Sequence, residues 1–339
     1  MTKIAINGFG RIGRLLFKEL IKHDNFEVVA INDLGDLENL AYLLKYDTVY
    51  RRFEEKIEIG NGELIVGGKK IKILQEKDPL KLPWKDLDVD IAVESTGVFD
   101  SYEKSEVHLK AGAKKVVITA PSRDAERADA KTVLMGINEA DFKVCKITSN
   151  GSCTTNATSP VAEIMKETIG IKKAVLNTVH SYTATQSIVD GPVKGKDFRR
   201  GRAAAQNISP STTGAAISVA RAIPELNGKF DGVAVRVPSI TGSLVDFTFV
   251  SEKKTSVEEI SAIFKKAEKE KRWEGIFKTT EDQIVSSDII GEPYGAIIDL
   301  KFTQVIDGDL VKIFSWYDNE AGYVSVLVKH IQKAAESLS

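Results

Sequence analysis

The most constraining feature of this sequence is a glycine pattern, Gly8-Phe-Gly10-Arg-Ile-Gly13, that lies between two periodic segments. Residues 3–7 have strand character, and residues 11–22 place apolar side chains at helical spacing. In a strand–turn–helix unit the first glycine permits a tight turn, the second lets a pyrophosphate approach, and the third allows close helix packing. N–H groups at the helix start then face the phosphates. The pattern therefore predicts a dinucleotide-binding unit, with an unrelated glycine turn as the alternative.

An acidic residue stands where such a unit needs one. Asp33 ends the second strand-like segment, residues 28–33, and lies 20 positions after Gly13. A carboxylate there bonds the ribose hydroxyls of the adenosine and repels a 2′-phosphate, so it favours NAD over NADP. The alternative is that Asp33 caps a helix.

The two halves of the chain differ in their periodicity. The first half alternates short apolar strands with helical segments, which predicts a Rossmann-type α/β domain with a parallel sheet covered on both faces. The second half has long strands with few helices, and Asp307-Gly308 is a hairpin signal, so we expect an α+β domain with a mostly antiparallel sheet. We place the first domain at residues 1–152, with residues 319–339 packing back on it, and the second at 153–318.

Composition excludes several classes of protein. The formal net charge is −1, whereas a dedicated nucleic-acid binder is usually strongly basic. We expect no membrane helix, because no apolar run reaches the ~18 residues required, and no secretory signal. The two cysteines make neither a disulfide framework nor a metal cluster, so we expect no metal and a reducing cytoplasm as the location.

One of these cysteines lies in an unusually polar local sequence. Residues 150–160 read NGSCTTNATSP, so Cys153 is surrounded by small hydroxyls and amides. It could be an inert thiol, a redox sensor or a nucleophile. A nucleophile needs thiolate, and a helix N-terminus or a histidinium would lower the thiol pKa from its free value of ~8.5. The helical pattern after Cys153 would supply such a terminus, and Pro160 inside it predicts a local kink.

The four histidines are unequal candidates for a base. His23 and His108 lie in polar helical segments and suggest solvated surface, whereas His330 in the last helix suggests a structural role. His180 ends an apolar strand among hydroxyl residues, which fits either a satisfied core histidine or a catalytic base. Spacing alone does not show that His180 touches Cys153.

A set of motifs in order connects these residues: GFGRIGR, AIND, ESTG, SCTTN, TVHSYTATQ, STTGAA, VRVP and SWYDNEAGY. Together they resemble the phosphorylating glyceraldehyde-3-phosphate dehydrogenase family over essentially the whole chain. The resemblance implies that Cys153 attacks the aldehyde of glyceraldehyde 3-phosphate, that His180 is the base, and that NAD⁺ accepts the hydride. Inorganic phosphate would then release 1,3-bisphosphoglycerate, a reversible step of glycolysis and gluconeogenesis.

The resemblance also implies the remaining site residues and the assembly. It makes residues 153–318 the catalytic domain and the protein a homotetramer. Cofactor contacts would come from Gly8, Gly10, Arg11, Ile12, Gly13, Asp33, Thr96, Gly97, Thr119 and Asn319, the last on the nicotinamide carboxamide. Phosphate contacts would come from Thr183 and Arg236 for the substrate, and from Ser152, Thr154, Thr213 and Gly214 for inorganic phosphate.

Two other functions remain open at this level. Erythrose-4-phosphate dehydrogenase is a relative with the same cysteine and histidine, in which the thioester goes to water. A member of another class, a redox-sensing or scaffold protein, could retain the fold without catalysis.

Overall fold

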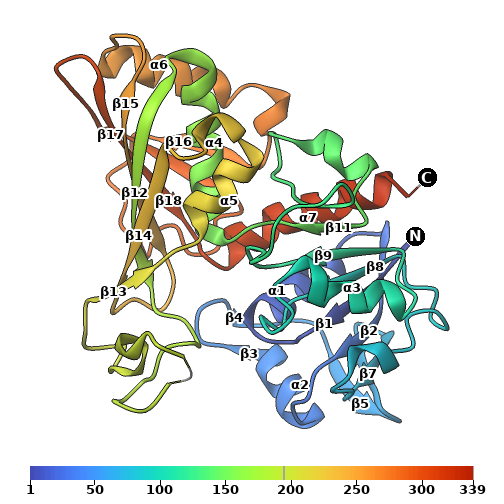
Figure 1. The fold of residues 1–339 in the computed structure, drawn as a ribbon. Coiled ribbons are helices and arrows are strands. Elements are labelled where there is room, and N and C mark those ends of the chain that lie inside the picture. The colour runs from blue at the N-terminus through green and yellow to red at the C-terminus, as the bar shows by residue number, and fades with distance from the viewer. Residues whose placement is uncertain (194, 339) are drawn as a thin grey trace. The chain divides into compact units, whose positions relative to one another are not determined.

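The computed structural model describes residues 1–193 and 195–338, shown as a ribbon in Figure 1. The chain forms two compact units. The first contains Met1–Gly151 together with the chain from Leu327 onward, and the second contains Ser152–Val326. The last helix, α7 (Ala321–Glu336), therefore begins in the second unit and ends in the first.

The first unit is built on a nine-stranded sheet in the order β10-β11-β9-β8-β1-β2-β7-β6-β5. Its strands are β1 (Thr2–Asn7), β2 (Phe26–Asn32), β5 (Ile57–Gly60), β6 (Glu63–Val66), β7 (Lys69–Leu74), β8 (Ile91–Glu94), β9 (Lys115–Ile118), β10 (Ala130–Thr132) and β11 (Ile147–Ser149). All neighbours from β10 to β7 are parallel, whereas β5, β6 and β7 pair antiparallel. Because β2 and β7 lie on one side of β1 and β8 and β9 on the other, the strand order reverses between β1 and β8, as in Rossmann folds.

Three helices connect these strands: α1 (Arg11–Leu20), α2 (Leu37–Lys45) and α3 (Tyr102–Lys110). A two-stranded ribbon, β3 (Tyr46–Asp47) and β4 (Arg51–Arg52), follows α2. Apolar residues of β1, β8 and β9 are buried, and most are fully enclosed, as expected for a parallel sheet covered on both faces.

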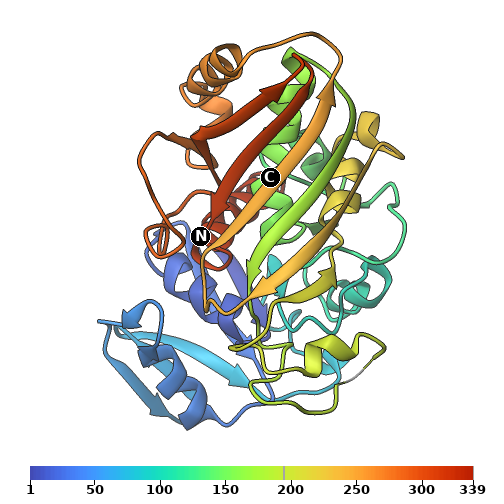
Figure 2. The same cartoon turned by 90° about the vertical axis from the view of Figure 1, so that its left-hand side faces the viewer.

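The second unit is built on a seven-stranded sheet in the order β13-β14-β12-β15-β18-β17-β16. Figure 2 shows its long strands lying side by side. They are β12 (Ile171–Ser181), β13 (Ser209–Thr212), β14 (Phe230–Val237), β15 (Ser243–Ser251), β16 (Phe277–Thr280), β17 (Ala296–Ile306) and β18 (Leu310–Tyr317). Four of the six pairings are antiparallel; β12 with β14 and β16 with β17 are parallel. Its helices are α4 (Cys153–Thr168), α5 (Ala215–Ala222) and α6 (Val257–Ala267).

Local signals explain several element ends. Asp307 and Gly308 both have positive φ, +49° and +74°, which is the turn geometry that joins β17 to β18. The Ser256 side chain caps α6 by accepting the Glu259 N–H. Gly170, at φ +76°, follows the end of α4.

The β-rich run KVCKIT at residues 143–148 predicts a strand, and this prediction is wrong for most of the run. β11 begins only at Ile147, and residues Glu139–Lys143 form a short 3₁₀ helix. The Cys145 N–H bonds the Asp141 carbonyl at 2.9 Å, so this segment satisfies its backbone within a turn. Within the described part of the chain, no helix is long and apolar enough to cross a membrane, and no group of three or more His, Cys, Asp or Glu could hold a metal ion.

Candidate active site and cofactor site

The glycine turn of the first unit has the geometry that a bound pyrophosphate requires. Gly8 has φ +99°, and a Cβ there would lie 2.6 Å from the Thr96 backbone nitrogen. A Cβ on Gly13 would lie 2.1 Å from the Gly8 carbonyl oxygen, so this glycine permits α1 to approach the turn. By contrast, a Cβ on Gly10 would meet no described atom within 4 Å, which leaves this side of the turn open to a ligand.

The Asp33 carboxylate lies against the same turn. It follows β2, and its Oδ2 accepts the Phe9 N–H at 2.7 Å while Oδ1 accepts the Gly35 N–H at 2.8 Å. Asp33 therefore does not cap the following helix, whose cap is Asp36. The half-buried carboxylate retains acceptor capacity for ribose hydroxyls.

The other residues predicted to contact the cofactor lie at the same edge of the sheet. Thr96 and Gly97 follow β8 and are exposed, and Thr119 follows β9 and bonds the Glu94 carbonyl through its N–H and its hydroxyl. Arg11 and Ile12 form the first turn of α1, where the Arg11 guanidinium lies 2.7 Å from Asp47. The carboxyl ends of parallel strands, a glycine turn and an acidic residue after β2 together fit a dinucleotide.

In the second unit the structure brings Cys153 and His180 together. Cys153 is the first residue of α4, and His180 lies near the end of β12. Their Sγ and Nε2 atoms are 3.4 Å apart. A capping box between Ser152 and Thr155 fixes the start of α4, since each side chain accepts the other residue's N–H. The thiol thus lies at the positive end of a 16-residue helix.

The other nitrogen of His180 has two neighbours. Nδ1 lies 2.6 Å from the Ser181 carbonyl and 2.6 Å from an Arg236 guanidinium nitrogen. A proton on Nδ1 would be donated to Ser181 and would leave Nε2 as an acceptor facing the thiol. A hydrogen bond from Arg236 instead requires Nδ1 to be the acceptor, which places the imidazole proton on the thiol side.

Protonation of the pair differs from the sequence-based expectation. Burial raises the pKa of the Cys153 thiol, although Arg236 and the Thr154 N–H act in the opposite direction. Burial and the positive charge of Arg236 lower the pKa of His180 to about 3. The lowered thiol pKa expected of a nucleophile is therefore not present in this structure, because lost hydration outweighs Arg236 and the hydrogen bonds to the sulfur. At neutral pH the pair is a thiol beside a neutral imidazole.

Arg236 lies beside His180 because their strands pair in register. β14 runs parallel to β12 and places Arg236 opposite His180. Arg236, Arg199 and Arg200 line one small hollow, and the Asp197 carboxylate lies 3.1 Å from Arg199 and 3.4 Å from Arg200. Arg199 and Arg200 were not among the predicted site residues, and both are paired with Asp197.

The predicted phosphate-binding hydroxyls make local contacts. Ser152 caps α4, and Thr213 accepts the Ala215 N–H at the start of α5, next to the exposed Gly214. The buried Thr154 hydroxyl lies 2.9 Å from the Tyr317 hydroxyl.

Thr183 and Asn319 lie elsewhere in the second unit. The Thr183 hydroxyl contacts that of Thr185 at 3.0 Å. Among the described residues, neither Thr183 nor Thr213 bonds Cys153, His180 or Arg236. Asn319 is buried, and its Oδ1 accepts the Gly242 N–H and the Ser243 hydroxyl, which leaves its amide NH₂ as the donor group for a ligand.

Sequence analysis missed Tyr317 as part of the site. Its hydroxyl contacts the hydroxyls of Thr154 and Thr178, and its ring packs edge-on against the His180 ring at 5.9 Å. Tyr317 therefore holds the imidazole from the side of β18. The sequence contained a signal for the position of Tyr317. Residues 310–317 alternate with period two, which places Tyr317 on the buried face of β18.

Comparison with known proteins agrees with this geometry. The profile of the family's NAD-binding domain matches residues 2–102, and that of the C-terminal domain of glyceraldehyde 3-phosphate dehydrogenase matches residues 152–319. The chain belongs to the glyceraldehyde-3-phosphate dehydrogenase family. Relatives with that name include a Thermotoga maritima protein, 51% identical over 98% of both chains, and a Clostridium pasteurianum protein, 46% identical over 99% of both. A Salmonella typhimurium relative is 46% identical over 98% of this chain and 99% of its own.

Family membership confirms several predictions. The protein is an NAD-dependent dehydrogenase of the glyceraldehyde-3-phosphate dehydrogenase family, with NAD as cofactor, and it has the Rossmann and α+β folds expected. The redox-sensor and scaffold alternatives therefore do not describe its primary role. Nothing in the comparisons supports the erythrose 4-phosphate alternative.

Proposed function

We propose that this protein oxidises glyceraldehyde 3-phosphate with NAD⁺ and inorganic phosphate to 1,3-bisphosphoglycerate, through a thioester on Cys153. The observation that carries the proposal is the 3.4 Å approach of Sγ to Nε2 of His180 at the N-terminus of α4. A thiol beside a base at the positive end of a helix is the arrangement that covalent catalysis by cysteine needs.

Proton movement follows from the His180 contacts. Nε2 takes the thiol proton as Sγ bonds the aldehyde carbon, and the imidazolium returns this proton to the carbonyl oxygen to give the thiohemiacetal. The neutral Nε2 then accepts the hydroxyl proton as the hydride leaves the same carbon. The Cys153 N–H at the helix start and the imidazolium steady the oxygen as charge develops. NAD⁺ supplies the hydride acceptor. Phosphate attacks the thioester carbonyl, the C–S bond breaks, and the sulfur leaves as thiolate.

Arg236 couples substrate binding to the base. A substrate phosphate bound to Arg236, with Thr183, would accept the guanidinium donors now directed at His180 and Ser181. Its negative charge would also oppose the effect of Arg236 on the imidazole, and so raise the pKa of His180. Ser152, Thr154, Thr213 and Gly214 are the proposed contacts of the attacking phosphate. Gly8, Gly10, Gly13, Asp33 and their neighbours hold the dinucleotide, with Asn319 on its carboxamide.

Assembly and location complete the proposal. We place the protein in the cytoplasm, consistent with two free cysteines, and propose a homotetramer. Four large apolar side chains in one segment are largely exposed, at 73 to 81%: Ile188, Val189, Phe198 and Ile208. Grouped exposure of this kind marks a protein-interaction surface. A second copy of the chain is the partner that the family resemblance implies.

The decisive experiment measures NADH formation with and without inorganic phosphate. We expect steady turnover of glyceraldehyde 3-phosphate to require phosphate, and Cys153→Ser to lose activity by at least about 10³-fold while still binding NAD. Erythrose 4-phosphate serves as the parallel substrate and should be used more slowly. Turnover that is indifferent to phosphate would rule out the acyl-phosphate step.

A further inference from the structure

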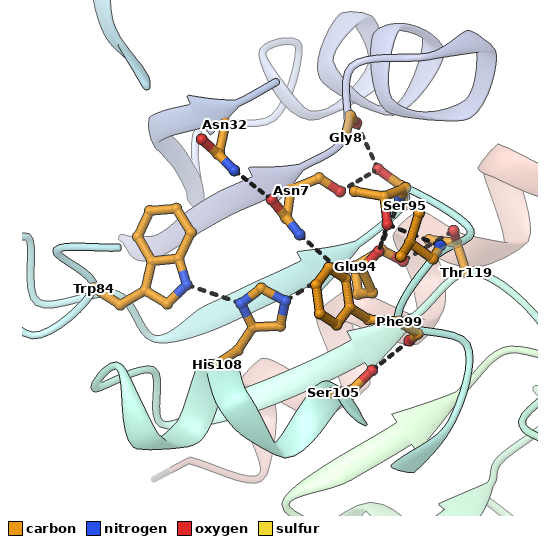
Figure 3. Close-up of polar contacts among 12 residues, drawn as sticks. Asn7, Gly8, Asn32, Trp84, Glu94, Ser95, Phe99, Ser105, His108 and Thr119 are labelled. Carbon is orange, nitrogen blue, oxygen red and sulfur yellow. Dashed lines mark hydrogen bonds and ion pairs between the residues drawn. The ribbon is translucent and has the colours of Figure 1, made fainter. Parts of the chain in front are cut away.

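A chain of buried polar side chains runs beneath the cofactor edge of the first unit, shown in Figure 3. Its centre is Glu94, the last residue of β8, which is 2% exposed. Oε1 accepts the N–H and hydroxyl of Thr96, at 2.8 and 2.5 Å. Oε2 lies 2.6 Å from the Asn7 amide nitrogen and 3.0 Å from Nε2 of His108. Four donors around two oxygens indicate an ionised carboxylate.

His108 holds this carboxylate from α3. We had expected a solvated histidine, and this was wrong: His108 is fully buried. The Trp84 indole N–H can only donate, and it bonds Nδ1 at 3.1 Å. The imidazole proton must then be on Nε2, directed at Glu94. Trp84 therefore selects the tautomer that makes His108 a donor to Glu94.

The chain continues to β2 through two amides. Asn32 donates to the Asn7 oxygen at 2.8 Å, and it also accepts the Glu76 N–H and donates to the Glu76 carbonyl, both at 2.9 Å. Each amide is thus oriented by its partners. β2 ends at Asn32, directly before the predicted ribose ligand Asp33.

These contacts end on the loops that face the dinucleotide. The Thr96 nitrogen is so close to Gly8 that no side chain fits there, and the Ser95 hydroxyl donates to the Gly8 carbonyl at 2.6 Å. The loop is also attached to α3, because the Ser105 hydroxyl bonds the Phe99 carbonyl at 2.7 Å. Burying a charged group is costly, and apolar side chains would fill this space more cheaply. We therefore explain this fully hydrogen-bonded network by the position in which it holds the Thr96 loop and the glycine turn, and not by a gain in stability.

We propose that Glu94 and His108 are positioning residues for NAD binding, acting through Thr96 and the glycine turn. His108 orients the Glu94 carboxylate, Glu94 holds the N–H and hydroxyl of Thr96, and Thr96 shapes the turn at Gly8. The inference rests on the cofactor of the family and is independent of the chemistry at Cys153.

Two matched substitutions of His108 distinguish its hydrogen bond to Trp84 from its hydrogen bond to Glu94. In His108→Asn the short amide can still accept from Trp84 but does not reach Glu94, whereas in His108→Gln the longer amide nitrogen reaches the position of Nε2. We expect the Kd for NAD, measured by titration without substrate, to rise about 5- to 10-fold in His108→Asn and to stay within about twofold in His108→Gln. The KM for NAD should follow the Kd, with kcat and the KM for the aldehyde nearly unchanged.

The control removes a buried hydrogen bond elsewhere on α3. Tyr102→Phe breaks the contact of the Tyr102 hydroxyl with Thr132, which does not touch Glu94. It should lower the Tm without changing the Kd for NAD.

Two outcomes would overturn the proposal. One is the same Kd for NAD in both His108 variants and in Tyr102→Phe. The other is an equal rise of the Kd in His108→Asn and His108→Gln. If His108→Asn does not fold, the isosteric Glu94→Gln replaces it: a raised Kd for NAD supports the proposal, and an unchanged Kd contradicts it. Because the readout is NAD binding, loss of the proposed reaction alone would not affect it.

Discussion

At the scale of single residues, similar side chains take different roles according to what surrounds them. His180 faces a thiol, His108 donates to a buried carboxylate, and His330 contacts the Thr148 hydroxyl at 2.7 Å. Burial lowers the pKa of both His180 and His330 to about 3. Only His180 has a reactive group opposite its ring nitrogen, so contact rather than burial identifies the base.

The depressed pKa of His330 predicts how stability depends on pH. This histidine is neutral when folded and takes up a proton below pH ~6.5 when unfolded, so its stabilising effect is present above pH 6.5 and is lost as the pH falls toward 3. The loss is at most about 1.4 kcal/mol per pH unit for one histidine. We therefore expect His330→Gln to show a smaller decrease in Tm than the native protein between pH 7.5 and 5.

Circular dichroism melts at several pH values test this. His180 contributes in the same direction, so the variant should retain part of the acid sensitivity. Parallel Tm curves for the two proteins would show that His330 does not titrate between the folded and unfolded states as stated.

At the scale of elements, the start of α4 combines a structural and a functional requirement. The capping box of Ser152 and Thr155 satisfies N–H groups of the first turn, and Cys153 lies between its two members. The same Ser152 hydroxyl is a proposed phosphate contact. Its two roles can be separated because Thr155 is fully buried and serves only the cap.

We expect Ser152→Ala and Thr155→Val each to cost about 1 kcal/mol of stability, because each breaks the capping box. Only Ser152→Ala should raise the KM for phosphate, by a few-fold. Denaturant unfolding and initial rates at varied phosphate concentration provide the two readouts. A matching increase in KM for Thr155→Val would mean that helix geometry, and not the hydroxyl, controls phosphate binding.

Elements with strong local signals were predictable from sequence. The glycine turn follows β1, the hairpin turn at Asp307-Gly308 joins β17 to β18, and the expected last helix is present as α7. The position of Cys153 at a helix start was also predictable, because small hydroxyl residues precede a helical pattern. Its contact with His180 was not, since it depends on how β12 and α4 pack, and only the family resemblance linked the two residues beforehand.

The buried network was not predicted because its residues are polar. α3 carries mostly charged and polar residues, which usually indicates a surface helix. Its buried positions are Tyr102, Ser105 and His108, which recur every three residues along one face. That spacing was the available signal, but a polar stripe can be recognised as buried only when the strand that it packs against is known.

At the scale of the whole molecule, the exposed apolar segment predicts assembly. We expect light scattering to give the mass of four chains of 37.2 kDa, and Ile188→Asp to shift the protein to smaller species because the charge enters an apolar interface. Val144→Asp, also at an exposed apolar residue but outside this segment, is the matched control and should leave the mass unchanged. A native protein that runs as a monomer would contradict the tetramer.

The helix that begins in one unit and ends in the other imposes an order on biosynthesis. His330 lies among buried groups of the first unit, and the Lys115 ammonium bonds the Ser337 hydroxyl. Residues translated after the second unit therefore complete a core whose other members are translated before it. The entire second unit leaves the ribosome before those residues do. The dinucleotide-binding unit of a nascent chain therefore stays incomplete until the second unit has been translated.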